Sequence, residues 1–120
     1  NIVGPADLSD PSFKSYYDYS FVENHLVDPT ILSKGISIED YASPVYWITK
    51  NASPTISFYG NNDTVIPLLQ KKILDSALNK NGILNQSFEF PGGHLDWANE
   101  KNAPFVIHSI SEFLMHTDKK

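Results

Sequence analysis

Hydrophobic positions in the second half of the chain follow two alternating patterns. Residues 54–60 form a short run rich in β-branched and aromatic side chains, and residues 87–90 form another, so both predict strands. Between them, apolar residues recur at helical spacing from Pro67 to Gly82, and a second helical pattern opens at Pro104. This order predicts parallel strands joined by a helical crossover, which is an α/β fold.

Each helical pattern has an apolar side that should pack against the sheet. The first helix has a stripe formed by Leu69, Ile73 and Ala77, flanked by Leu74 and Leu78. The apolar face of the last helix consists of Val106, Ile110, Phe113 and Leu114. His108 and His116 fall outside that face and should be exposed to solvent, whereas His25 has no comparable context and no assigned role. We therefore expect a strand-helix-strand-helix unit over residues 54–117.

The first 50 residues lack a regular pattern. Ile2 and Val3 resemble the end of a strand, and since a strand needs ~5 residues, we expect a third parallel strand whose beginning is absent. Residues 12–50 are rich in aromatic side chains without strand periodicity, which predicts an irregular helical insertion whose rings either cover a pocket or pack on the core. Residues 1–120 would then form one partial domain with about three parallel strands.

Charge and composition exclude several classes of function. The chain has 14 acidic and 9 basic residues and a net charge of −5, which disfavours nucleic acid as a partner. All the cations are lysines, so no guanidinium clamp for phosphate exists. Cysteine is absent, which removes thiolate nucleophiles and Cys-ligated zinc. No apolar run approaches the ~20 residues that would predict a membrane span.

The loops after the two predicted strands carry the candidate catalytic residues. Asp63 follows the first strand and His94 the second, 31 residues later, which is the length of one crossover. Neighbouring parallel strands would bring these loops side by side. A carboxylate that accepts from one imidazole nitrogen fixes the tautomer and leaves the other nitrogen free to act as a base. In the alternative interpretation, Asp63 has no catalytic role and only caps its turn.

Other side chains near this pair have weaker signals. Asp96 is a rival carboxylate for His94, and the two together could suggest a metal site. Only two ligands are evident, so we expect neither a metal nor another cofactor. Val65, Leu95 and Trp97 flank the pair and are candidates for a substrate pocket, although packing explains each of them equally simply.

These loops resemble the C-terminal part of an α/β-hydrolase of the esterase and lipase type. In that family a Gly-x-x-Asp-x-x-Val-Pro-like loop carries the acidic member of a catalytic triad, and a Gly-His loop carries the base. Gly60, Asp63, Pro67 and His94 match this order, and residues 4–8 look like the family's Gly-Pro-x-Asp-Leu segment. The resemblance implies a partial α/β-hydrolase fold with Asp63 and His94 as two triad members.

The family's nucleophile elbow, Gly-x-Ser-x-Gly, does not occur in the sequence. The resemblance therefore implies the C-terminal portion of a serine carboxylesterase or lipase-like hydrolase that acts on a small-molecule ester and is inactive without its serine. Either the missing N-terminal half or self-association would complete the domain. The alternatives are a fragment of a prolyl-oligopeptidase-like serine peptidase and a non-catalytic, oligomerising interaction module. Nothing in the sequence assigns a cellular compartment.

Overall fold

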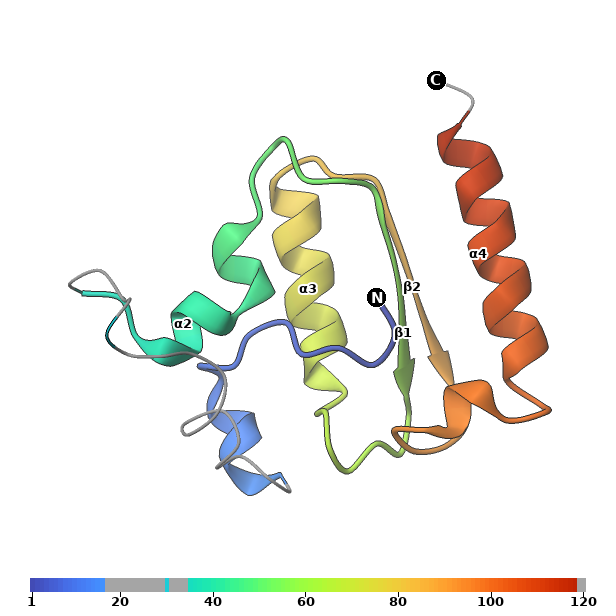
Figure 1. Ribbon diagram of the computed structural model, residues 1–120, viewed down its shortest axis with the longest axis horizontal. Coiled ribbons are helices and arrows are strands. Elements are labelled where there is room, and N and C mark those ends of the chain that lie inside the picture. The colour runs from blue at the N-terminus through green and yellow to red at the C-terminus, as the bar shows by residue number, and fades with distance from the viewer. Residues whose placement is uncertain (17–29, 31–34, 119–120) are drawn as a thin grey trace.

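The computed structural model describes residues 1–16, 30 and 35–118 of this chain. Its fold is mixed α/β: Figure 1 shows the strands edge-on, with one long helix on either side of them. Within the insertion predicted over residues 12–50, residues 17–29 and 31–34 lie outside the described residues, and they include His25. Within the described ranges, none of the helices combines the length and the apolar character that crossing a bilayer requires.

The sheet is built from β1 (Thr55–Gly60) and β2 (Asn85–Phe90), which pair in parallel along their whole length. Helix α3 (Leu69–Lys80) makes the crossover between them, and α4 (Ala103–Thr117) follows a short 3-10 turn, η4 (Asp96–Ala98). The crossover is direct, so both strands end at the same edge of the sheet (Figure 1). The loops that carry Asp63 and His94 both begin at that edge.

The expected third strand is reduced to a single bridge in the described residues. Ile2 pairs in parallel with Phe58, whose N–H donates to Asn1 O at 3.0 Å while its C=O accepts from Val3 N–H at 2.9 Å. Val3 then adopts a φ of 48°, a left-handed conformation that is unusual for a β-branched residue, and the chain turns away at Gly4. Within the part of the chain that the structure describes, the sheet therefore has two strands, and the expected count of about three is not confirmed.

Short helical turns form the described parts of the first half. They are η1 (Pro11–Ser15), α2 (Ile38–Ala42) and η3 (Pro44–Trp47). Side chains cap two of them: Asp10 Oδ1 accepts from Ser12 N–H, and Ser37 Oγ accepts from Asp40 N–H. These turns match the expected irregular helical character.

Packing on the core, one of the two alternatives predicted for the aromatic rings of this region, does not describe most of the rings that the structure places. Trp47 makes edge-to-face contacts with Tyr41 and Tyr46, at ring centroid distances of 5.5 and 5.1 Å, and all three side chains are exposed. Phe13 alone among the described rings of residues 12–50 is buried, in a cluster with Leu8, Tyr59 and Ile66.

Alternation along the strands divides the remaining core between the two faces of the sheet. Phe58 stacks on the neighbouring Phe88, with ring centroids 5.6 Å apart, and packs with Phe90 and Val106 on the α4 side. On the α3 side, a separate cluster is formed by Ala6, Leu74, Leu78 and Ile83. Each helix thus covers one face of the sheet.

The buried stripe of α3 lies one residue away from the predicted one. Leu69 is 45% exposed, whereas the neighbouring Gln70 is fully buried in line with Leu74 and Leu78. The Gln70 Oε1 atom accepts from the backbone N–H groups of Ala6 and Asp7 at 2.8 and 2.7 Å, which satisfies this oxygen, whereas the buried Nε2 atom has no partner among the described residues. This side chain therefore ties the opening segment to α3.

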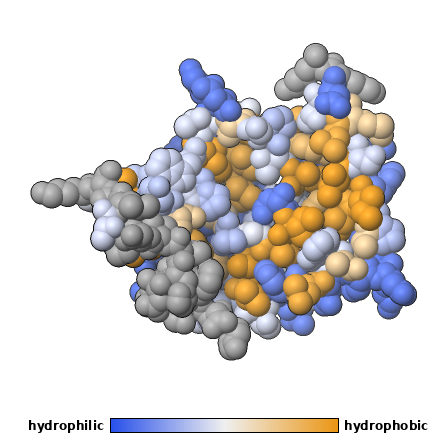
Figure 2. Space-filling model, in the orientation of Figure 1, coloured by the Kyte–Doolittle hydropathy of each residue, from blue (hydrophilic) through white to orange (hydrophobic). Residues whose placement is uncertain are grey.

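On α4, Val106 and Phe113 are buried as expected, but Leu114 is half exposed. Ile107 is also exposed, by 67%, and Figure 2 shows apolar surface along this helix. His108 and His116 are exposed, as the sequence predicts. One flank of α4 is thus apolar and uncovered.

Candidate functional site

The loops that follow β1 and β2 bring Asp63 and His94 together. The Nδ1 atom of His94 lies 2.8 Å from Oδ2 of Asp63. The Asp63 side chain is 1% exposed, whereas the His94 ring is 29% exposed. The carboxylate is therefore shielded from water, and part of the imidazole remains accessible to a reacting group.

The second oxygen of the Asp63 carboxylate holds its own loop. Its Oδ1 atom accepts from Val65 N–H at 2.7 Å and from Ile66 N–H at 2.9 Å. The turn-capping role that competed with the acid role in the sequence is thus real, and it uses a different oxygen. The same two bonds orient the carboxylate so that Oδ2 faces His94.

This geometry determines which imidazole nitrogen carries the proton. An ionised carboxylate only accepts hydrogen bonds, so Nδ1 of a neutral His94 must donate to Asp63. The lone pair then resides on Nε2, which can take a proton from a nucleophile. The arrangement can therefore act as a general base oriented by a carboxylate.

Asp96, the rival carboxylate, has another partner. Its Oδ2 atom accepts from Gly93 N–H at 2.7 Å, within the loop that carries His94. The pair therefore consists of His94 with Asp63. Among the residues that the structure describes, no group of three or more His, Asp or Glu side chains is placed to hold a metal ion.

The two loops approach each other at backbone level. Asn62 N–H donates to Gly92 O at 2.9 Å, and Asn61 Oδ1 accepts from Gly92 N–H at 3.1 Å. A Cβ atom on Gly60 would lie only 2.7 Å from Gly92 O, so this position needs glycine. The close approach sets the short distance between Asp63 and His94.

Sequence reasoning missed two residues of this region. They are Asn61, which bonds the neighbouring loop, and Asn102, a buried asparagine at the start of α4. Asparagine is common in turns and at helix ends, so neither residue differs from a simple turn former in the sequence. Only their position in the sequence pointed to the site: Asn61 is two residues before Asp63, and Asn102 is eight residues after His94.

The three pocket candidates lie in different surroundings. Val65 packs against the cluster around Tyr59, and Trp97 packs against the cluster around Phe58 on the α4 side. Leu95 is 76% exposed. Val65 and Trp97 thus belong to different clusters of the described residues, and a substrate contact by any of the three stays a prediction.

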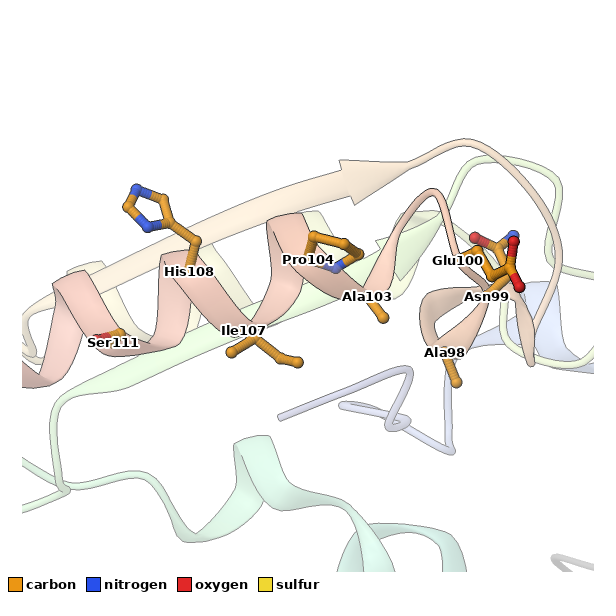
Figure 3. A pocket seen from close by; sticks show the side chains of 8 residues that line it. All are labelled: Ala98, Asn99, Glu100, Ala103, Pro104, Ile107, His108 and Ser111. Carbon is orange, nitrogen blue, oxygen red and sulfur yellow. The ribbon is translucent and has the colours of Figure 1, made fainter.

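A hollow of about 290 Å³ lies beside the acid loop, lined by Ser15, Tyr16, Asn62, Asp63 and Thr64. A larger hollow of about 720 Å³ runs along the first turns of α4 (Figure 3). Its lining includes neither Asp63 nor His94, and Figure 3 shows His108 and Ile107 pointing to different sides of the helix. The larger hollow therefore lies away from the Asp63–His94 pair, and the smaller one lies beside Asp63.

Comparisons with known proteins bear on the fold. No protein-family model matches the chain, and no curated protein gives a significant sequence match. A thermophilic esterase from the planctomycete Thermogutta terrifontis, solved with butyrate bound, matches 68% of this chain with a TM-score of 0.61 and 21% identity. The fold is esterase-like.

Two further structures of that esterase, native and propionate-bound, match 68% of this chain with TM-scores of 0.60 and 22% identity. The matched region spans 31 to 32% of the esterase chain, so this chain corresponds to about a third of that protein. At this level of identity the likeness concerns the fold. It supports the α/β class and a hydrolase-like arrangement of the elements.

Proposed function

We propose that this chain is the C-terminal part of a serine carboxylesterase and supplies two members of its Ser-His-Asp triad, Asp63 and His94. The observation that carries the proposal is the 2.8 Å contact between Nδ1 of His94 and the buried carboxylate of Asp63. The esterase-like fold supports the same assignment, because functional groups collect at the carboxyl ends of parallel strands.

In the complete enzyme, Nε2 of His94 accepts the proton of the serine hydroxyl while the serine oxygen bonds to the ester carbonyl carbon. Asp63 stabilises the imidazolium that results. The imidazolium then donates this proton to the departing alkoxide, which releases the alcohol and leaves an acyl-serine. A water molecule repeats the sequence: it gives its proton to His94, its oxygen bonds to the acyl carbon, and the serine oxygen leaves with the proton.

We place the serine and the oxyanion hole outside this chain, because no Gly-x-Ser-x-Gly occurs in it. The exposed apolar side chains Ile107 and Leu114 offer a surface on which the N-terminal half can pack. Ile2 lies at the sheet edge next to β1, where a further strand can pair. Residues 1–120 thus act as one partial domain that gains activity on complementation.

We propose a small, neutral ester as the substrate. The esterase structures with a similar fold hold butyrate or propionate, which are short-chain carboxylates. A prolyl-oligopeptidase-like peptidase is the competing assignment within serine hydrolases. The chain has no arginine to bind a charged peptide terminus, and this favours the ester.

The test has two parts. The isolated chain should give no covalent adduct with a fluorophosphonate and should not hydrolyse nitrophenyl butyrate; labelling of a unique serine within it would refute the assignment. Extended upstream in its reading frame, the protein should hydrolyse nitrophenyl esters in preference to Pro-containing amides. His94→Gln should abolish that activity, while the exposed His108→Gln should retain it.

A non-catalytic, oligomerising interaction module is the second candidate. The exposed apolar flank of α4 favours it, since such a surface also promotes pairing between copies. Sedimentation of the purified chain tests it, because a compact monomer contradicts the module. A dimer is compatible with both assignments, and the esterase activity of the upstream-extended protein then distinguishes them.

A further inference from the structure

The loop that carries His94 is held at both ends by one buried side chain. Asn102, which is 6% exposed, lies at the start of α4. Its Nδ2 atom donates to Pro91 O at 2.9 Å and to Asp96 O at 2.8 Å. These two carbonyls stand three residues before His94 and two residues after it. A single amide group therefore bridges the two ends of the loop that carries the imidazole.

Asn102 is itself fixed by α4. Its backbone N–H donates to Asn99 Oδ1 at 2.8 Å, and its C=O accepts from Val106 N–H at 3.0 Å. Val106 is buried against Phe58 in the core under the sheet. A rigid connection thus runs from the core through the helix to the His94 loop.

The chemistry of the side chain suits this role. An NH₂ group has two donors, and both are used here on carbonyl oxygens. A carboxylate in the same place would put an acceptor against two acceptors. Asn102 stands at the N-cap position of α4, but its side chain makes no capping bond; Asn99 Oδ1 instead accepts from the N–H groups of Lys101 and Asn102. Helix capping therefore does not explain the burial of this amide.

We infer that Asn102 is a positioning residue that keeps His94 within bonding distance of Asp63. The inference rests on the proposed function, in which that contact orients the base. Asn102 acts through the backbone of the loop and touches neither the imidazole nor a substrate. Loss of its two hydrogen bonds should raise the population of open loop conformations about tenfold or more.

The test is nuclear magnetic resonance of the full chain with ¹⁵N-labelled histidine. The wild type should show a downfield Nδ1–H signal with the Nδ1–H tautomer, assigned to His94 through its loss in His94→Gln. Asn102→Leu, of similar size but without donors, should accelerate exchange of this proton with water about tenfold or broaden it beyond detection. Phe113→Leu is the matched control, because it weakens the packing of α4 at a buried position away from the loop but leaves every hydrogen bond of Asn102 in place, and it should preserve the signal.

Each outcome has a separate meaning. If the wild type lacks the His94 signal, the proposed pairing with Asp63 is wrong. If the wild type has it and Asn102→Leu exchanges at the same rate, the pairing stands and the role of Asn102 is refuted. An equal acceleration in Phe113→Leu would also refute that role, since any weakening of α4 would then suffice. Should Asn102→Leu fail to fold, Asn102→Ser, which keeps one shorter donor, should give an intermediate exchange rate, and a wild-type rate would contradict the inference.

Discussion

Replacing Gly60 with alanine tests how closely the acid and base loops must approach. The added Cβ would lie 2.7 Å from Gly92 O, 3.0 Å from Gly93 O and 3.1 Å from a ring carbon of Phe90. Two of these three atoms belong to the backbone, so the neighbouring loop itself must move. Overpacking of this kind costs about 1–3 kcal/mol, and we expect Gly60→Ala to lower the free energy of unfolding by about 2 kcal/mol.

For a domain of this length, that loss corresponds to a Tm lower by roughly 8 °C. Urea denaturation followed by circular dichroism gives the free energy, and an unchanged m value would show that the unfolded state is unaffected. The downfield Nδ1–H signal of His94 should also weaken, because the displaced loop carries this residue away from Asp63.

Gly93→Ala is the matched control. A Cβ at Gly93 would meet its nearest atoms at 3.6 and 3.7 Å, which are ordinary contact distances, and its φ is not positive. We expect its stability to stay within about 0.5 kcal/mol of the wild type. If Gly60→Ala were as stable as Gly93→Ala, the close approach of the two loops would be refuted.

Three other outcomes are expected. Burial raises the pKa of Tyr59 to about 12, so above pH 10 unfolding releases a proton that the folded state retains. Stability should therefore fall by up to about 1.4 kcal/mol per pH unit between pH 10 and 12, and denaturation of Tyr59→Phe should lack this component. In the complete enzyme, Asp63→Asn should lower kcat for a nitrophenyl ester about ten-thousand-fold, because an amide can stabilise the wrong imidazole tautomer; a loss below tenfold would contradict the acid role. Ile107→Glu should leave the free energy of unfolding of the chain within about 0.5 kcal/mol, yet reduce the activity recovered on complementation, and full recovery would place the docking surface elsewhere.

The sequence was informative wherever local pattern decides the structure. β1 begins at Thr55 and β2 ends at Phe90, within a residue or two of the expected strands. The proximity of Asp63 and His94 was also predictable, because one crossover between parallel strands forces the two loops together. Their catalytic roles stay predictions until activity is measured.

The burial of two polar side chains could not be predicted from the sequence, because it depends on hydrogen bonds to other segments of the chain. Gln70 is buried because the opening segment supplies two N–H groups to its Oε1 atom. These donors lie more than sixty residues away in the chain, so the residues around Gln70 do not indicate them. The burial of Asn102 likewise depends on acceptors that lie in another segment, the His94 loop. Leu114 is exposed although it extends the apolar face of α4, since no element of the described residues covers that flank.

The parallel pairing of β1 with β2 places both polar partners, together with the Asn102 amide that bridges the His94 loop, on one contiguous stretch of fewer than fifty residues, from Thr55 to Asn102. Its two strands pair residues that are thirty positions apart, so the contact between Asp63 and His94 closes within the stretch itself. A protein engineer could therefore treat it as a transplantable cassette, grafting an oriented imidazole onto another parallel sheet that already carries its own nucleophile.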